Sequence, residues 1–170
     1  MKILYLHGLE SKPGGPKVEY LEMLGHEVHN PKINYLDSDQ FKILHDEIAI
    51  AQFDLIIGSS MGGYFGYELG RHFDIPVLLL NPALHSRSIE PRVEKLHEDL
   101  AADPLVFLGV GANDDVINYE KTLEILDDEA RCFFRPNYFK GNHGHQTPLD
   151  FFQKIFDAVE IRLNKIKANV

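Results

Sequence analysis

The stretch that decides the fold is Asp54-Leu-Ile-Ile-Gly58-Ser59-Ser60-Met61-Gly62-Gly63-Tyr64. An apolar run ends here in the pattern Gly-x-Ser-x-Gly, and a segment with helical potential follows it. Small residues two places before and two places after the serine let neighbouring backbone pass close to a tight strand-to-helix turn. The hydroxyl of Ser60 would then stand clear at the carboxyl end of the strand. We therefore expect Ser60 to be a nucleophile and the Ser59 side chain to point away from the site.

The motif alone is short, and its three fixed positions also occur in glycine-rich turns that have no catalytic role. Its place between an apolar run and a helix favours the catalytic interpretation. A helix that begins near Met61 would also offer a backbone N–H and a partial positive charge to an oxyanion. Both features predict an active site around Ser60.

Outward from the motif, short apolar runs alternate with segments long enough for helices. Three runs (55–57, 77–80 and 105–108) are continuously apolar, which is typical of parallel strands covered on both faces. We expect an α/β fold with about six mostly parallel strands flanked by helices, in a single domain over residues 1–170. The expected strands are 2–7, 27–30, 54–58, 77–81, 105–110 and 131–135, and the expected helices are roughly 16–24, 41–51, 62–73, 89–100, 119–126 and 148–165.

The composition and net charge of the chain disfavour several classes of function. The chain has 170 residues, 44% of them hydrophobic and 25% charged, as in an ordinary globular protein. A formal net charge of −9 disfavours nucleic acid as a partner. The only cysteine, Cys132, cannot form an internal disulfide, and the apolar run 3–6 is too short for a signal peptide or a membrane span. We expect a cytoplasmic protein without a membrane partner, and its oligomeric state stays open.

A nucleophilic serine needs a base, and the base needs a carboxylate that holds its tautomer. The apolar run 105–110 ends in a polar turn that contains Asp114 and Asp115. Ligand-facing groups gather at such carboxyl ends of parallel strands, so either aspartate could be the acid. The same residues also favour a simple turn or helix cap. The only histidines after this turn, His143 and His145, lie in the segment 138–146, which we expect to be a loop.

The motif 58–63, together with the opening Leu4-Tyr5-Leu6-His7-Gly8, resembles the α/β-hydrolase superfamily. More narrowly, the stretch 5–13 is similar to the small YqiA-type esterase family. The resemblance implies a minimal α/β-hydrolase fold and a serine hydrolase with a Ser-Asp-His triad, without a metal ion or an organic cofactor. It covers nearly the whole chain in order.

The resemblance also assigns roles. Gly111-x-x-Asp114-x-x-Ile117 is similar to the acid loop of the superfamily, which favours Asp114 over Asp115. His143 matches the Gly-x-His pattern of the family and is expected to be the general base, whereas the histidine at position 145 departs from that pattern. The backbone N–H groups of Leu9 and Met61 are expected to form the oxyanion hole.

Three further expectations concern the histidines and the loops. His7 should brace its turn through hydrogen bonds rather than take part in acid–base chemistry. The pair His143-x-His145 lacks the additional ligands that zinc needs, so we expect no metal.

The interval between the strands 77–81 and 105–110 is too short for a cap domain. An active site without a cap favours substrates with small or soluble acyl groups.

These observations predict a serine carboxylesterase that cleaves small or soluble acyl esters through an acyl-enzyme. A thioesterase or an amidase with the same triad is an alternative, because the triad says little about the leaving group. A non-catalytic binding module with the α/β-hydrolase fold is another. The physiological substrate stays open.

Overall fold

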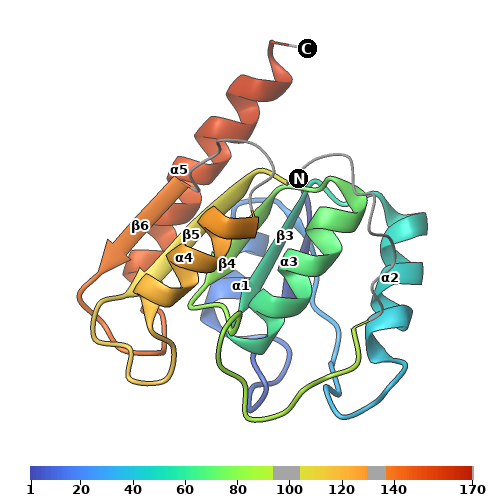
Figure 1. Ribbon diagram of the computed structural model, residues 1–170. Coiled ribbons are helices and arrows are strands. Elements are labelled where there is room, and N and C mark those ends of the chain that lie inside the picture. The colour runs from blue at the N-terminus through green and yellow to red at the C-terminus, as the bar shows by residue number, and fades with distance from the viewer. Residues whose placement is uncertain (94–103, 130–136, 170) are drawn as a thin grey trace.

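The computed structural model describes residues 1–93, 104–129 and 137–169 (Figure 1). Its centre is a six-stranded sheet in the order β2-β1-β3-β4-β5-β6, in which each neighbouring pair is parallel. The strands are β1 (Lys2–Leu6), β2 (Glu27–His29), β3 (Leu55–Ser59), β4 (Val77–Leu80), β5 (Val106–Gly111) and β6 (Asn137–Gly141). The helices are α1 (Pro16–Met23), α2 (Gln40–Ala51), α3 (Met61–Phe73), α4 (Tyr119–Glu129) and α5 (Leu149–Lys167).

Helices cover both faces of the sheet because successive side chains of each strand point to opposite sides. On one face, Leu55 and Ile57 of β3 belong to a buried cluster with Phe152 of α5. On the other face, Ile56 belongs to a cluster with Phe65 of α3. Residues of α1 join the first cluster, and residues of α2 and α4 join the second. The two-sided burial explains the continuously apolar strands and confirms the predicted α/β layering.

The sheet has a topological switch at β1, which pairs with β2 on one side and with β3 on the other. Chains that wind outward in both directions from such a point leave a crevice at the carboxyl ends of the central strands. Ser60 follows β3 and the turn that begins at His7 follows β1. The fold therefore places both turns at the edge where a ligand site is expected.

The last strand differs from the prediction. The expected strand 131–135 lies outside the described residues, and β6 occupies Asn137–Gly141, which we had mostly expected to be loop. This edge strand alternates half-buried and exposed side chains, so it lacks the continuous apolar run that revealed the central strands. Of the expected helix 89–100, residues 89–93 are not helical and the remainder lies outside the described residues.

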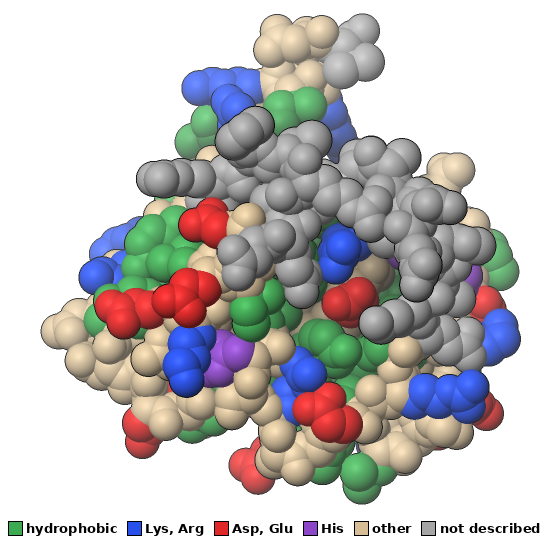
Figure 2. Space-filling model, viewed as in Figure 1, with side chains coloured by type: hydrophobic (Ala, Val, Ile, Leu, Met, Phe, Trp, Pro, Cys, Tyr) green, Lys and Arg blue, Asp and Glu red, His purple; other side chains and the backbone are tan. Residues whose placement is uncertain are grey.

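Charged side chains of both signs are mixed on the face that Figure 2 shows, and hydrophobic side chains lie between them. Among the described residues, no helix is both long enough and apolar enough to cross a membrane.

Candidate active site

Ser60 occupies the tight turn between β3 and α3. Its backbone has φ 52° and ψ −115°, a conformation that residues other than glycine rarely adopt. Hydrogen bonds hold this conformation, because the Ser60 N–H donates to Leu80 O at 2.9 Å and the Ser60 carbonyl accepts from the N–H of Ala83 at 2.9 Å. The neighbouring strand β4 and the segment after it therefore fix the serine in its strained turn.

The two motif glycines are needed for space rather than for a special φ. A Cβ at Gly58 would lie 2.6 Å from the carbonyl carbon of Gly62. A Cβ at Gly62 would lie 2.6 Å from the carbonyl carbon of Leu6. Since real Cβ atoms do not approach backbone this closely, the turn can form only with glycine at both places. The close approach of backbone that the glycine spacing predicts is thus present in the structure.

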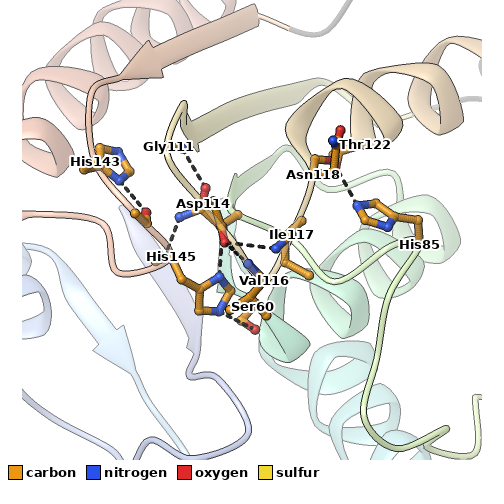
Figure 3. A network of polar contacts seen from close by, with 12 residues as sticks. Ser60, His85, Gly111, Asp114, Val116, Ile117, Asn118, Thr122, His143 and His145 are labelled. Atoms are coloured by element: carbon orange, nitrogen blue, oxygen red, sulfur yellow. Dashed lines mark hydrogen bonds and ion pairs between the residues drawn. The ribbon is translucent and has the colours of Figure 1, made fainter.

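Ser60, His145 and Asp114 form a hydrogen-bonded chain (Figure 3). His145 Nδ1 lies 2.9 Å from Asp114 Oδ2, and His145 Nε2 lies 3.1 Å from Ser60 Oγ. A carboxylate only accepts hydrogen bonds, so Nδ1 carries the proton and Nε2 is left to accept from the serine hydroxyl. This is the arrangement in which an imidazole can remove the proton of a serine.

Asp114 is held by its own loop. Its Oδ1 accepts the backbone N–H groups of Val116 at 2.8 Å and Ile117 at 2.9 Å, and only 1% of the side chain is exposed. These bonds leave Oδ2 directed at His145 (Figure 3). Asp115 is exposed, and the carboxylate that bonds to the histidine is that of Asp114. Of the two aspartates considered from the sequence, the structure thus brings Asp114 to the site.

His143, expected to be the base, does not contact Ser60. Its Nδ1 donates to the carbonyl of Gly144 at 2.8 Å, and its ring packs edge-on against Phe151 with the centroids 4.8 Å apart. In Figure 3 it lies away from the chain that joins His145 to Ser60. The structure therefore corrects this placement: His145 makes the contact that we expected of His143.

Packing around the His143 ring explains why His145, and not His143, contacts Ser60. A Cβ at Gly111 would lie 2.7 Å from His143 Nδ1, and a Cβ at Gly141 would lie 2.9 Å from His143 Nε2. The glycines that end β5 and β6 thus leave a space that the His143 ring fills, and His145 is then the histidine that faces the serine. The Gly-x-His spacing pointed to His143, which is the histidine that fills this space. Spacing in the sequence does not tell which of two histidines in one loop faces the serine.

Asn81 is a site residue that was not predicted from the sequence. It follows β4, is 2% exposed and has φ 42°. Its side-chain Nδ2 donates to the carbonyl of His145 at 2.6 Å, and its Oδ1 accepts the N–H of Gly111 at 2.8 Å. One amide therefore joins the loop of the histidine to the strand that leads to Asp114. The only signal in the sequence is an asparagine directly after a buried strand.

His7 braces the turn after β1, as predicted. The N–H of Ile33 donates to His7 Nε2 at 3.1 Å, so Nδ1 carries the proton and donates to the carbonyl of Gly8 at 2.8 Å. The hydroxyl of Tyr35 donates to the carbonyl of His7. These bonds fix the turn that carries Leu9. Within the described chain, neither the N–H of Leu9 nor that of Met61 donates to a protein acceptor.

A cavity of about 600 Å³ opens at this edge of the sheet and is bounded by Ser60 and His145. The segment between β1 and α1, together with the start of α1, forms much of its wall. The other lining residues are Tyr5, Ser59, Ser88, Val116 and the two residues that follow His145. No group of three or more histidine, cysteine, aspartate or glutamate side chains in the described residues could hold a metal ion. The cavity thus brings the Ser60 hydroxyl and the His145 imidazole together on one wall.

Comparisons with known proteins agree with this architecture. The family model of UPF0227, an uncharacterised protein family, matches residues 2–103. The chain resembles the esterase domain of a Rhodothermus marinus protein with a TM-score of 0.65 at 14% identity, covering 93% of this chain and 83% of that one. It also resembles esterase PE8 with a TM-score of 0.59 at 15% identity, covering 93% and 90%.

A third similar structure is an uncharacterised protein from Bacillus cereus ATCC 10987, with a TM-score of 0.62 and 15% identity. The match covers 94% of this chain and 59% of that protein, which is therefore much longer. Identities this low establish the fold alone. The structural similarities confirm the predicted fold class, a small α/β-hydrolase-like fold.

Proposed function

The chain belongs to the UPF0227 family, as the resemblance to YqiA-type proteins predicted, and on that premise we propose that it is a serine esterase that cleaves small acyl esters. The observation that carries the proposal is the chain of hydrogen bonds from Asp114 through His145 to Ser60. The three residues follow one another along the sequence in the order known for α/β-hydrolases, with the nucleophile first and the histidine last. The esterase-like fold of the structural neighbours supports the same reaction class.

In the first half of the reaction, Ser60 Oγ bonds to the carbonyl carbon of the ester while His145 Nε2 takes the hydroxyl proton. The carbonyl electrons move to the oxygen, which becomes an oxyanion. The free N–H groups of Leu9 and Met61 are the donors we assign to this oxyanion. The bond to the alcohol oxygen then breaks, and the alcohol leaves with the proton from His145.

In the second half, water attacks the acyl-enzyme and gives its proton to His145. The bond between the acyl carbon and Ser60 breaks, the acid leaves and the serine regains its proton. Throughout, Asp114 accepts hydrogen bonds from the N–H groups of Val116 and Ile117 through Oδ1 and from His145 Nδ1 through Oδ2. Its role is to hold the tautomer of His145 and to stabilise the positive charge of the imidazolium.

Labelling with a fluorophosphonate tests whether the serine is activated. We expect the wild-type protein to be labelled and Ser60→Ala to be unlabelled, whereas the matched Ser59→Ala should still react. Failure of the folded wild-type protein to react would favour the alternative of a non-catalytic binding module.

Hydrolysis of acetyl, butyryl and palmitoyl p-nitrophenyl esters tests the acyl range. We expect the short esters to be preferred, and a preference for palmitoyl would contradict the small-acyl part of the proposal. Thioesters and amides with the same acyl group belong in this screen, since the triad would serve them equally.

A further inference from the structure

Two lysines lie on the wall of the active-site cavity. Lys12 and Lys17 line the same cavity as Ser60 and His145, and they come from the segment that joins β1 to α1. Glu10 is the only carboxylate among the lining residues. The wall next to the nucleophile thus carries more ammonium than carboxylate charge, although the whole chain has a net charge of −9.

Neither ammonium group has a counter-ion in the part of the chain that the structure describes. Other lysines are paired: Lys2 with Glu27 at 3.3 Å, and Lys42 with Asp46 at 2.6 Å. Lys17 is half-buried, and this burial lowers its pKa. An ammonium that loses water without gaining a negative partner is costly, so an anion from outside the chain would be stabilised beside it.

The start of α1 points to the same kind of ligand. Lys17 is the second residue of the helix, where the helix dipole disfavours a cation. No side chain caps this end, because the N-cap is Gly15 and it makes no side-chain hydrogen bond. The first-turn N–H groups therefore lack the acceptor that a serine or aspartate would usually supply. An anion would satisfy these N–H groups and the lysine together.

We propose that Lys12 and Lys17 form an anion subsite of the active-site cavity, and that the substrate is an acyl ester that carries a carboxylate or phosphate group away from the scissile bond. The inference rests on the proposed esterase function and names its substrate class. Ammonium groups bind either anion as point charges, so the subsite chemistry is shared by both.

Matched pairs of esters test the subsite. One pair places a carboxylate on the acyl side, with 4-nitrophenyl hydrogen glutarate compared with 4-nitrophenyl pentanoate. The other pair places a phosphate on the alcohol side, with 3-butyryloxypropyl phosphate compared with pentyl butyrate. We expect the wild-type protein to prefer the anionic member of at least one pair by about tenfold in kcat/KM, from charge-assisted contacts at a partly exposed site. The pair that shows the preference tells which side of the ester faces the lysines.

The double variant Lys12→Gln/Lys17→Gln should lose this preference, mainly through a higher KM, while its activity on the neutral ester stays within about twofold of wild type. Lys154→Gln is the matched control, because this exposed α5 lysine lies outside the cavity and its loss changes the net charge in the same direction. The inference would be overturned by equal activity on both members of both pairs, or by an equal loss in the double variant and the control.

A binding measurement separates failure of the subsite from failure of the esterase function. Glutarate and inorganic phosphate are titrated into the wild-type protein, Ser60→Ala and the double lysine variant, and thermal unfolding is followed. We expect at least one anion to raise Tm in the first two and not in the third. That result without any ester hydrolysis would retain the subsite and reject the esterase function. Hydrolysis of neutral esters without any anion effect would retain the esterase function and reject the subsite.

Discussion

At the scale of single residues, His145 is the group on which the proposed chemistry depends. We predict that His145→Gln lowers kcat for p-nitrophenyl butyrate by about a thousandfold or more, because Ser60 loses its proton acceptor. The fluorophosphonate labelling rate should fall in parallel. Steady-state kinetics and labelling at matched protein concentration measure both effects.

His143→Gln is the control for this prediction, since both substitutions remove one imidazole from the same loop. We expect it to reduce kcat by about tenfold at most and to cost about 1 kcal/mol of stability, because the ring packs against Phe151. A larger loss of kcat in His143→Gln than in His145→Gln would restore His143 as the base.

The roles of these two histidines could not be predicted from the sequence, whereas those of other single residues could. Ser60 was predictable because the backbone of its turn dictates glycine at fixed offsets. Asp114 was preferred for its place in a polar turn after a buried strand and for its likeness to the acid loop. The likeness to the Gly-x-His pattern favoured His143 over His145, and the structure reverses that choice. Their roles depend on the room left by Gly111 and Gly141, which only packing in three dimensions reveals.

At the scale of elements, the contact between β1 and α3 requires a glycine. We predict that Gly62→Ala abolishes activity and destabilises the protein by about 3 kcal/mol or more, because the new Cβ would overlap the backbone of Leu6 and His7. Circular dichroism during urea unfolding measures the loss.

Gly66→Ala is the matched control in the same helix. Its Cβ would lie 3.2 Å from the Ile56 side chain, a contact that a small shift relieves, while alanine favours the helix. We expect stability within about 1 kcal/mol of wild type. Equal losses in the two variants would show that the close approach of β1 is not the cause.

Asn81 connects the elements that carry the acid and the base. We predict that Asn81→Gly lowers kcat by about tenfold with little change in KM, because His145 O and Gly111 N–H lose their partner and the loops shift. Glycine also accepts the observed φ of 42°, so the substitution adds no backbone strain. Parallel measurement of kcat, KM and labelling rate separates poor positioning from poor binding.

Asn113→Gly provides the comparison, since the exposed Asn113 side chain bonds only to the side chain of Asn142 in the described chain, and glycine keeps the N–H that donates to the carbonyl of His143. We expect it to leave kcat nearly unchanged. An unchanged kcat in Asn81→Gly would remove the positioning role from Asn81.

The elements themselves were predictable to different degrees. β3 and β4 are buried on both faces and read as continuous apolar runs, so their positions were found within one residue. β6 is an edge strand that alternates exposure, and its pattern resembles a polar loop. Helices with one apolar stripe, such as α5, were also found. The polar residues of β6 therefore hid this strand from the sequence prediction.

At the scale of the whole molecule, the order of the sheet brings the three separate segments of the site together. Parallel strands bring residues after β3, β5 and β6 to one edge, although Ser60 and His145 are 85 positions apart in the chain. Integrity of the sheet is therefore a condition for the site, and contacts that join distant parts of the chain contribute to it.

One such contact joins both ends of the chain to β3. Asp54 Oδ2 accepts the N–H of Lys2 at 2.6 Å, and Oδ1 pairs with Lys167 at 2.5 Å. Burial alone would raise the pKa of Asp54, but the Lys167 ion pair and the Lys2 N–H outweigh it and hold the pKa below its ordinary value of 3.8. A carboxyl with a lowered pKa in the folded state stabilises the protein above that ordinary value, and this contribution is lost as the pH falls through the folded-state pKa.

We predict that Asp54→Asn lowers the free energy of unfolding at neutral pH by about 0.5 kcal/mol, a small value because the pair is partly exposed and screened by water. The difference from wild type should shrink as the pH falls below 3.8 and vanish once Asp54 is protonated in both states. Urea unfolding at a series of pH values measures it, with Asp127→Asn on the exposed side of α4 as the control for a lost carboxylate. A deficit that persists unchanged at acidic pH would mean that Asp54 acts through packing rather than through its charge.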